Sequence, residues 1–196
     1  MPRLQADADP STWVAVTGSL GLRGRRHRKA AIRMLLSQGS RMMGGAGRPN
    51  GVLAWAISQA APLMMRRADG RLLVWVWKDD PELLVVMAQL QDLTPQLRAA
   101  RAMMPIEYDD TESFRGAYLG MGERLVIDLP PQPATPPFAT YTWDTGAHLV
   151  TVTAVSGDRE RFRTVLGAAD ALARSVRIID DLRVGETTGV LRLDPA

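Results

Sequence analysis

The chain has 196 residues, with 24 Lys and Arg against 21 Asp and Glu, two His and no Cys. The lack of cysteine excludes a disulfide scaffold, a cysteine-ligated zinc site and a thiol enzyme. Hydrophobic residues make up 46% of the chain, an ordinary share for a globular protein, and the length fits one domain or one domain with an appendage.

Charge is distributed unevenly along the chain. Residues 1–70 carry a formal charge of +8, and the remainder carries −5. No acidic residue lies between Asp9 and Asp69, and the densest basic run falls inside this window: Arg23, Arg25, Arg26, Arg28, Lys29 and Arg33. Such a run favours contact with phosphate-bearing surfaces, either nucleic acid or anionic lipid. In the alternative interpretation, acids neutralise the run within the fold or across a dimer: Glu107, Asp109, Asp110 and Glu112.

The sequence predicts neither an export signal nor a membrane-spanning segment. The first residues lack the apolar core of a signal peptide. The longest apolar stretch, residues 51–65, is shorter than the about 20 residues that a spanning helix needs. We therefore expect a protein without a transmembrane segment, located in the cytoplasm.

The first half of the chain mixes strand and helix patterns. Residues 13–17 predict a short strand, and the apolar spacing over residues 25–43 predicts an amphipathic helix with its arginines mostly on the other side. Residues 44–51 predict a flexible, glycine-rich loop. Periodicity leaves residues 52–61 open between a helix and a buried strand.

A strand and two helices are predicted next. Asp69 and Gly70 indicate a turn before a strand over residues 71–77, which are rich in β-branched and aromatic side chains. A helix is expected to open at Pro81, with an apolar face made of Leu83, Leu84, Met87 and Leu90. Thr94 fits an N-cap before a proline at the first helical position, so a further helix is predicted from residue 95 to about residue 104.

The second half predicts two hairpins and one clear helix. The strands and turns of the hairpins are expected at residues 113–119, 120–122 and 124–129, and at residues 138–143, 144–146 and 148–155. Residues 156–158 start an amphipathic helix with one apolar stripe from Phe162 to Val176. Residues 176–179 predict a last core strand.

These patterns indicate an α+β fold. Strands outnumber the crossover helices that a parallel sheet needs, so we predict a mainly antiparallel sheet built from hairpins, with amphipathic helices packed on one face.

We divide the chain into a basic, methionine-rich part (1–129), a proline-rich connector (130–137) and a strand–strand–helix–strand part (138–196). The connector is either an internal crossover or a domain linker. The order of elements in the last part is similar to the end of PsbP/Mog1-type α+β domains, which are mostly non-catalytic accessory proteins.

A glycine-rich motif follows the first predicted strand. It matches the TGxxGxxG turn at Thr17, Gly18, Gly21 and Gly24. This spacing resembles short-chain dehydrogenase-like enzymes, and the resemblance implies a turn that approaches the pyrophosphate of a nucleotide such as NADP. The family's ribose-binding acid is expected about 20 residues later, but none occurs before Asp69, and neither lysine completes a Tyr-x-x-x-Lys pair. The alternative is a glycine-punctuated loop between a strand and a basic helix.

Acid–base and metal-ligating groups are sparse. His27 lies inside the basic run, His148 begins a predicted strand, and neither adjoins a nucleophile motif. Residues 107–112 offer carboxylates without the spacing of an EF-hand loop. We therefore predict no catalytic residue, no metal site and no cofactor. Eight of the ten methionines lie between Met34 and Met104, a composition that fits either core filling or an adaptable apolar contact surface.

The function predicted from these observations is that of a non-catalytic interaction or accessory protein. Its basic run, Arg23 to Arg33, is expected to contact a protein partner, a second copy of the chain or an anionic surface. Two alternatives stay open. One is an NADP-like nucleotide-binding protein that uses residues 17–24, and the other is a binder of phosphate backbones or anionic lipid.

Overall fold

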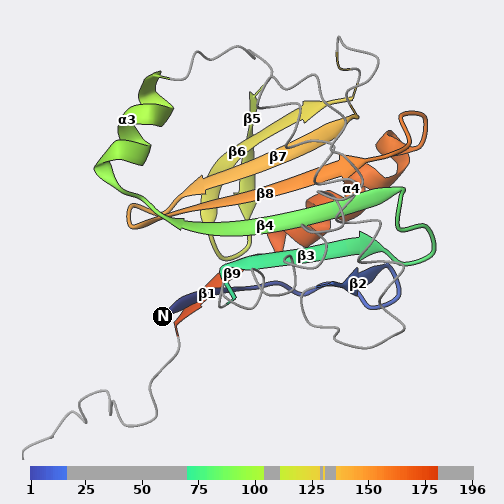
Figure 1. Cartoon of the computed structure of the whole chain (residues 1–196), viewed down its shortest axis with the longest axis horizontal. Coiled ribbons are helices and arrows are strands. Elements are labelled where there is room, and N and C mark those ends of the chain that lie inside the picture. Colours follow the sequence, from blue (N-terminus) through green and yellow to red (C-terminus); the bar gives the residue numbers. More distant parts are fainter. Residues whose placement is uncertain (17–69, 104–110, 129, 131–135, 181–196) are drawn as a thin grey trace, which may run out of the picture.

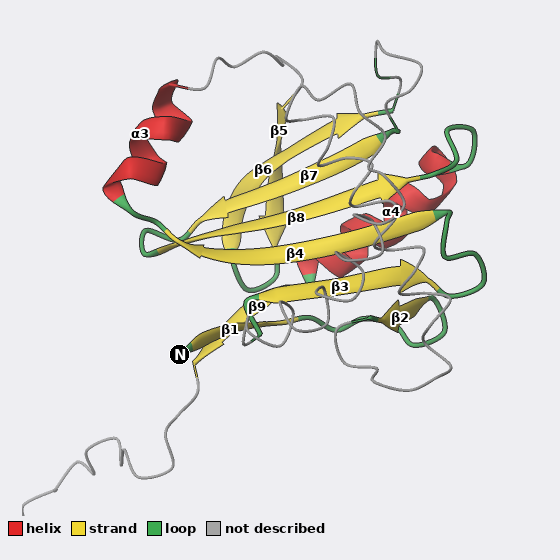
Figure 2. Cartoon of the chain, viewed as in Figure 1, coloured by secondary structure: helices red, strands yellow, loops and turns green. Residues whose placement is uncertain are grey.

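The computed structural model describes residues 1–16, 70–103, 111–128, 130 and 136–180. They form a seven-stranded sheet with the order β2-β3-β4-β8-β7-β6-β5 and a separate two-stranded sheet of β1 and β9 (Figure 1). The strands are β1 (Pro2–Gln5), β2 (Trp13–Ala15), β3 (Leu72–Trp77), β4 (Leu84–Asp92), β5 (Thr111–Gly116), β6 (Gly120–Ile127), β7 (Phe138–Asp144), β8 (His148–Ser156) and β9 (Arg177–Asp180). The described helices are α3 (Pro95–Met103) and α4 (Phe162–Arg174) (Figure 2).

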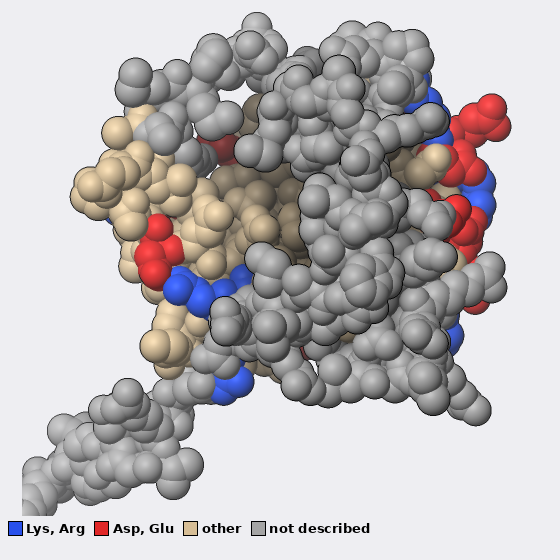
Figure 3. Space-filling view, viewed as in Figure 1, with Lys and Arg blue, Asp and Glu red and all other residues tan. Residues whose placement is uncertain are grey.

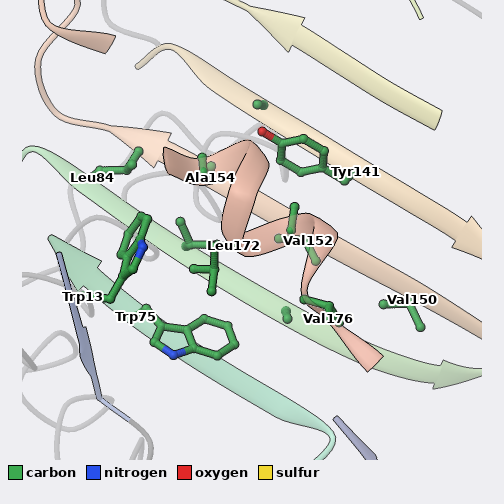
Figure 4. Close-up of a cluster of buried hydrophobic side chains, with 14 of the residues drawn as sticks. Trp13, Trp75, Leu84, Tyr141, Val150, Val152, Ala154, Leu172 and Val176 are labelled. Atoms are coloured by element: carbon green, nitrogen blue, oxygen red, sulfur yellow. The ribbon is translucent and has the colours of Figure 1, made fainter. Parts of the chain in front are cut away.

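The main core lies between the large sheet and α4. Side chains alternate across a strand, so Ala139, Tyr141 and Trp143 of β7 share one face, and all three are fully buried. The apolar stripe of α4 joins the same core through Phe162, Val165, Ala169, Leu172 and Ala173. Figure 4 shows Leu172 among the sheet side chains Trp75 and Val152. The amphipathic helix predicted here is therefore confirmed.

The helix predicted to begin at Pro81 is wrong, because residues 84–92 form strand β4. β4 pairs with β3 on one side and with β8 on the other. Its neighbouring side chains Val85 and Val86 point to opposite faces, and both are completely buried. A central strand that buries both faces carries a continuous apolar run, which periodicity alone does not distinguish from a helix.

Both predicted hairpins are confirmed, with one turn displaced. β7 and β8 pair from Phe138 opposite Val155 to Asp144 opposite Leu149. β5 and β6 are joined by residues 117–119 rather than by residues 120–122. Gly120 begins β6 with a φ of 77°, a backbone conformation that favours glycine, so this residue ends the turn that the sequence analysis expected it to begin.

The predicted final strand exists as β9, but it is not part of the large sheet. It pairs with β1, where Leu4 lies opposite Ile178. The sequence analysis did not predict β1, since four residues with one buried apolar side chain carry too little alternation to signal a strand. A hydrogen-bonded ion pair between Asp7 and Arg177 closes this two-stranded sheet, with Oδ2 and Nη1 2.6 Å apart.

The predicted α+β class with a mainly antiparallel sheet is confirmed, because every strand pairing in the described residues is antiparallel. The helix predicted from residue 95 is also confirmed as α3. The finer expectation, that the helices pack together on one face, is not confirmed. α4 adds five buried residues to the core, whereas residues 95–99 of α3 are exposed or half-buried.

Candidate interaction surface

The basic run and the glycine motif lie outside the described residues. They comprise Arg23, Arg25, Arg26, Arg28, Lys29 and Arg33, and Thr17, Gly18, Gly21 and Gly24. Both sets of residues belong to the connection 17–69, and the described residues at its two ends are hydrogen-bonded to the rest of the fold. The Val16 backbone N–H donates to the Val74 carbonyl at 2.8 Å, and the Leu4 N–H donates to the Gly70 carbonyl at 2.8 Å. The basic run therefore belongs to a connection between β3 and β2, the strand at one edge of the sheet.

Many carboxylates of the described residues pair with arginines of the same part of the chain. Arg161 Nη1 lies 3.1 Å from Asp80 Oδ2, which joins the approach to α4 to the approach to β4. The other pairs include Arg71–Asp92, Arg163–Asp128 and Arg177–Asp7. These carboxylates therefore already have basic partners outside residues 17–69.

The acids proposed to neutralise the basic run are only partly described. Glu112 is exposed on the edge strand β5, and its Oε2 lies 3.4 Å from Arg124 Nη1 of the neighbouring strand. Glu107, Asp109 and Asp110 lie outside the described residues. The one acid of this group that is described thus has a partner within the sheet.

A buried polar cluster joins α4 to the sheet. The Tyr141 hydroxyl donates to Asp170 Oδ1 at 2.7 Å, and Arg124 Nε lies 3.3 Å from the same oxygen. Burial raises the pKa of Tyr141 well above its ordinary value, and the hydrogen bond to Asp170 raises it further. A tyrosine with a raised pKa stays neutral and donates a hydrogen bond to the carboxylate, so this cluster anchors α4 to the sheet.

The sequence analysis missed this cluster. Two signals were present: Tyr141 occupies an inward position of an alternating strand, and Asp170 adjoins the apolar stripe of a predicted helix. A carboxylate at the margin of a buried stripe needs a donor, and an inward tyrosine supplies one. The pairing of these two distant residues follows from the tertiary packing, which sequence periodicity does not give.

His148, one of the two histidines considered as acid–base groups, lies at one end of the large sheet. Its Nε2 is 3.5 Å from Asp92 Oδ1. Arg71 makes a bidentate ion pair with the same carboxylate, and the hydrogen bonds from Arg71 hold the pKa of Asp92 below its ordinary value. His148 begins β8, Asp92 ends β4, and Arg71 directly precedes β3. The contact therefore joins the ends of three adjacent strands.

The face of the sheet opposite α4 carries a second apolar cluster, which we call the valine cluster. It consists of Val16, Val74, Val76, Val85 and Val155, whose exposed fractions are between 0% and 4%. Half-buried Leu72, Met87 and Phe138 pack against it. Figure 1 views the sheet from this side, with α4 behind it.

A band of uncharged polar side chains adjoins the valine cluster. Four half-buried threonines form two cross-strand pairs, Thr140 opposite Thr153 and Thr142 opposite Thr151. Gln89 of β4 lies opposite Thr151 and extends the band. Figure 3 views the molecule from the same side, and most of the described residues visible inside its hollow are neither basic nor acidic. The named residues of this face are therefore apolar or neutral and polar, and none of them carries a charge.

Within the described ranges, no helix is both long and apolar enough to cross a membrane. The same part of the chain holds no group of three or more His, Asp or Glu side chains arranged to bind a metal ion. No protein-family model matches the chain, and no curated protein matches it. The observations define a class of fold: a mainly antiparallel α+β protein whose basic segment connects an edge strand to its neighbour.

Proposed function

We propose that the protein is a non-catalytic interaction or accessory protein. In this proposal the sheet holds both ends of residues 17–69, and the basic run within them contacts a partner. The observation that carries the proposal is that five described carboxylates pair with arginines outside that segment: Asp7, Asp80, Asp92, Asp128 and Asp170. Because these acids already pair with other arginines, the basic run retains its attraction for an external anion.

The chemistry of the run favours phosphate as the group that it contacts. Five of its six basic residues are arginines, whose planar guanidinium groups bind phosphate oxygens in pairs. No aromatic residue occurs between Trp13 and Trp55, so stacking on nucleic-acid bases lacks a platform within this run. A phosphate backbone or a phospholipid surface fits these features, and an acidic protein surface or a second copy of the chain is the remaining class of partner.

The nucleotide alternative has less support. A dinucleotide-binding glycine turn normally joins a strand of a parallel β-α-β unit to a helix. β2, the strand before residues 17–24, is a three-residue edge strand whose neighbour β3 runs antiparallel to it. A glycine-punctuated loop is therefore the interpretation of Thr17, Gly18, Gly21 and Gly24 that agrees better with these neighbours.

Native mass spectrometry of the full chain at low and at raised salt tests the proposal. We expect a bound companion at low salt that dissociates at raised salt and is lost in a triple variant, Arg25→Ala, Arg26→Ala and Arg28→Ala. A second triple variant, Arg41→Ala, Arg66→Ala and Arg67→Ala, removes the same charge from the same segment and should keep the companion. An adduct of nucleotide size that survives raised salt contradicts the proposal, as does a companion that both variants retain equally.

Two further predictions belong to this proposal. The connector at residues 130–137 divides the chain into its two parts, and the protein acts in the cytoplasm. Limited proteolysis tests the prediction about the connector. A domain linker is cleaved earlier than the folded parts, whereas an internal crossover is protected.

A further inference from the structure

β1 and β9 form a small sheet that is separate from the seven-stranded sheet. The two strands lie far apart in the sequence and pair over four residues, from Pro2 opposite Asp180 to Gln5 opposite Arg177. A two-stranded ribbon of this length is at best marginally stable by itself. The small sheet therefore depends on its contacts with the rest of the fold, and it opens at a lower free energy than the central strands of the large sheet.

β1 lies against Gly70, the first described residue after residues 17–69. The Leu4 N–H donates to the Gly70 carbonyl at 2.8 Å, and the Leu4 side chain is buried in the main core. Gly70 has a φ of 77°, and a Cβ added to it would come within 2.7 Å of Arg3 Cδ. Figure 1 shows β1 beside the start of β3. While β1 is in place, Gly70 is therefore held by backbone and side-chain contacts of the same strand.

The other end of residues 17–69 is attached at a different place. The Val16 N–H donates to the Val74 carbonyl at 2.8 Å, and Val16 belongs to the valine cluster. Leu4 belongs instead to the main core, on the side of the large sheet that α4 covers. The two attachments therefore share neither a strand pair nor an apolar cluster, and the loss of one does not require the loss of the other.

Arg177 fastens β1 to β9. Its Nη1 and Nη2 donate to the two carboxylate oxygens of Asp7 at 2.6 and 2.9 Å, and its Nε donates to Gln5 Oε1 at 3.2 Å. Its Cζ lies 5.0 Å from the ring centroid of Tyr118, in the turn between β5 and β6. The position of β1 thus depends on a group of polar contacts around one arginine.

We infer that the β1–β9 sheet is a strap that opens without unfolding of the large sheet. In the closed strap, Leu4 holds Gly70, and both ends of residues 17–69 are attached. In the open strap, the attachment at Gly70 is lost and the attachment at Val16 remains. The strap therefore changes how one end of the segment that carries the basic run is held. This device does not depend on the proposed function, because it opens in the same way whatever the basic run contacts.

Amide hydrogen exchange of the full chain, resolved by residue with NMR, tests the strap. The Leu4 N–H reports the attachment at Gly70, the Val16 N–H reports the other end, and the Val86 N–H reports the centre of the large sheet. We expect Leu4 to exchange faster than Val86 by at least about tenfold. Arg177→Gln removes the fastener and should speed exchange at Leu4 by a further factor of about three to ten, with Val16 and Val86 unchanged.

Arg163→Gln is the matched control. It removes another arginine that pairs with an aspartate, Asp128, and should leave all three exchange rates unchanged.

A disulfide gives the opposite change. Arg3 and Ile179 lie directly opposite each other in the β1–β9 pair, at a Cα separation that a disulfide can span. The natural chain has no cysteine, so Arg3→Cys with Ile179→Cys forms a single bond, whose presence mass spectrometry verifies. Oxidation of this variant should slow exchange at Leu4 by about tenfold, and reduction should restore the rate.

Three results would overturn the strap. Equal exchange rates at Leu4 and Val86 in the natural chain would mean that β1 leaves only when the whole fold opens. Equal acceleration of Leu4, Val16 and Val86 in Arg177→Gln would mean that the arginine stabilises the fold in general. A disulfide that leaves the Leu4 rate unchanged would mean that Gly70 is released without separation of β1 from β9.

Discussion

At the scale of single residues, a close approach between backbone and indole organises the β5–β6–β7 end of the sheet. Trp143 is fully buried and stacks near Tyr141, with ring centroids 6.4 Å apart. Its ring lies over Gly122, where an added Cβ would come within 2.5 Å of the Thr142 carbonyl oxygen and of Trp143 Cδ1. The indole therefore occupies the volume that any other residue at position 122 would need.

Gly122→Ala is expected to destabilise the fold by about 1–3 kcal/mol, the usual cost of overpacking a rigid site. The contact is with backbone as well as with a buried ring, so neither neighbour moves freely. Gly167→Ala serves as the control, because a Cβ there meets nothing within 4 Å and the residue lies inside α4. That change should stabilise by about 0.5–1 kcal/mol through helix propensity. Chemical denaturation measures both, and a neutral Gly122→Ala contradicts the packing described here.

Removing the Tyr141 hydroxyl tests the buried polar cluster. Tyr141→Phe leaves Asp170, whose side chain is only 14% exposed, without the donor at 2.7 Å. We expect a loss of about 1–3 kcal/mol in the free energy of unfolding, because a buried acceptor that loses its partner keeps its desolvation cost. Thr142→Val, a change of similar size on the opposite face of the same strand, is the control. Equal small losses in both variants would show that Asp170 does not need the tyrosine.

The contact between Asp7 and Arg177 gives the β1–β9 sheet a pH dependence. Hydrogen bonds from Arg177 hold the pKa of Asp7 below its ordinary value of about 3.9. A carboxyl whose folded pKa is depressed contributes stability above its unfolded pKa, and that contribution is lost as pH falls through the folded pKa. An NMR titration should place the Asp7 midpoint below the ordinary value and move it upward in Arg177→Gln. An unchanged midpoint in the variant would contradict the pairing.

At the scale of elements, the sequence predicted best those strands whose two faces differ. β7 and β8 alternate between side chains buried against α4 and half-buried threonines, and both were predicted within one residue at each end. β4 was mistaken for a helix because it is buried on both faces. β1 escaped prediction because its pairing with β9, at the far end of the chain, is what makes it a strand.

Position in the sheet predicts the order in which strands open. β4 and β8 pair over nine consecutive residues at the centre of the sheet, whereas β2 pairs over three at its edge. Amide hydrogen exchange should therefore be slowest in β4 and β8 and faster by at least about tenfold in β2 and β9, which have fewer neighbours. Protection of β2 equal to that of β4 would contradict this order.

At the scale of the whole molecule, the charge asymmetry was visible in the sequence but its placement was not. Counting charges located the basic run between Asp9 and Asp69. Only the strand order shows that this window joins an edge strand to its neighbour, because β2–β3 pairing is a long-range contact. The partners of individual acids, such as Asp170 and Asp80, likewise depend on elements that are distant in sequence. The composition of the chain therefore identifies the basic run as the candidate site, and the fold shows which strands lie at the two ends of the segment that contains it.

The central claim is that the basic run binds a phosphate-bearing partner, and the salt dependence of binding tests it most directly. The measurement compares the affinity of the wild-type chain with that of the Arg25→Ala, Arg26→Ala and Arg28→Ala variant, for duplex DNA and for vesicles containing phosphatidylglycerol, across a series of salt concentrations. For DNA, each neutralised phosphate contributes about 0.9 to the slope of log affinity against log salt. The account predicts steep salt dependence for at least one probe and, with DNA, a slope reduced by up to about 3 in the variant. Binding that is insensitive to salt, or slopes that are identical in the two proteins, would contradict it.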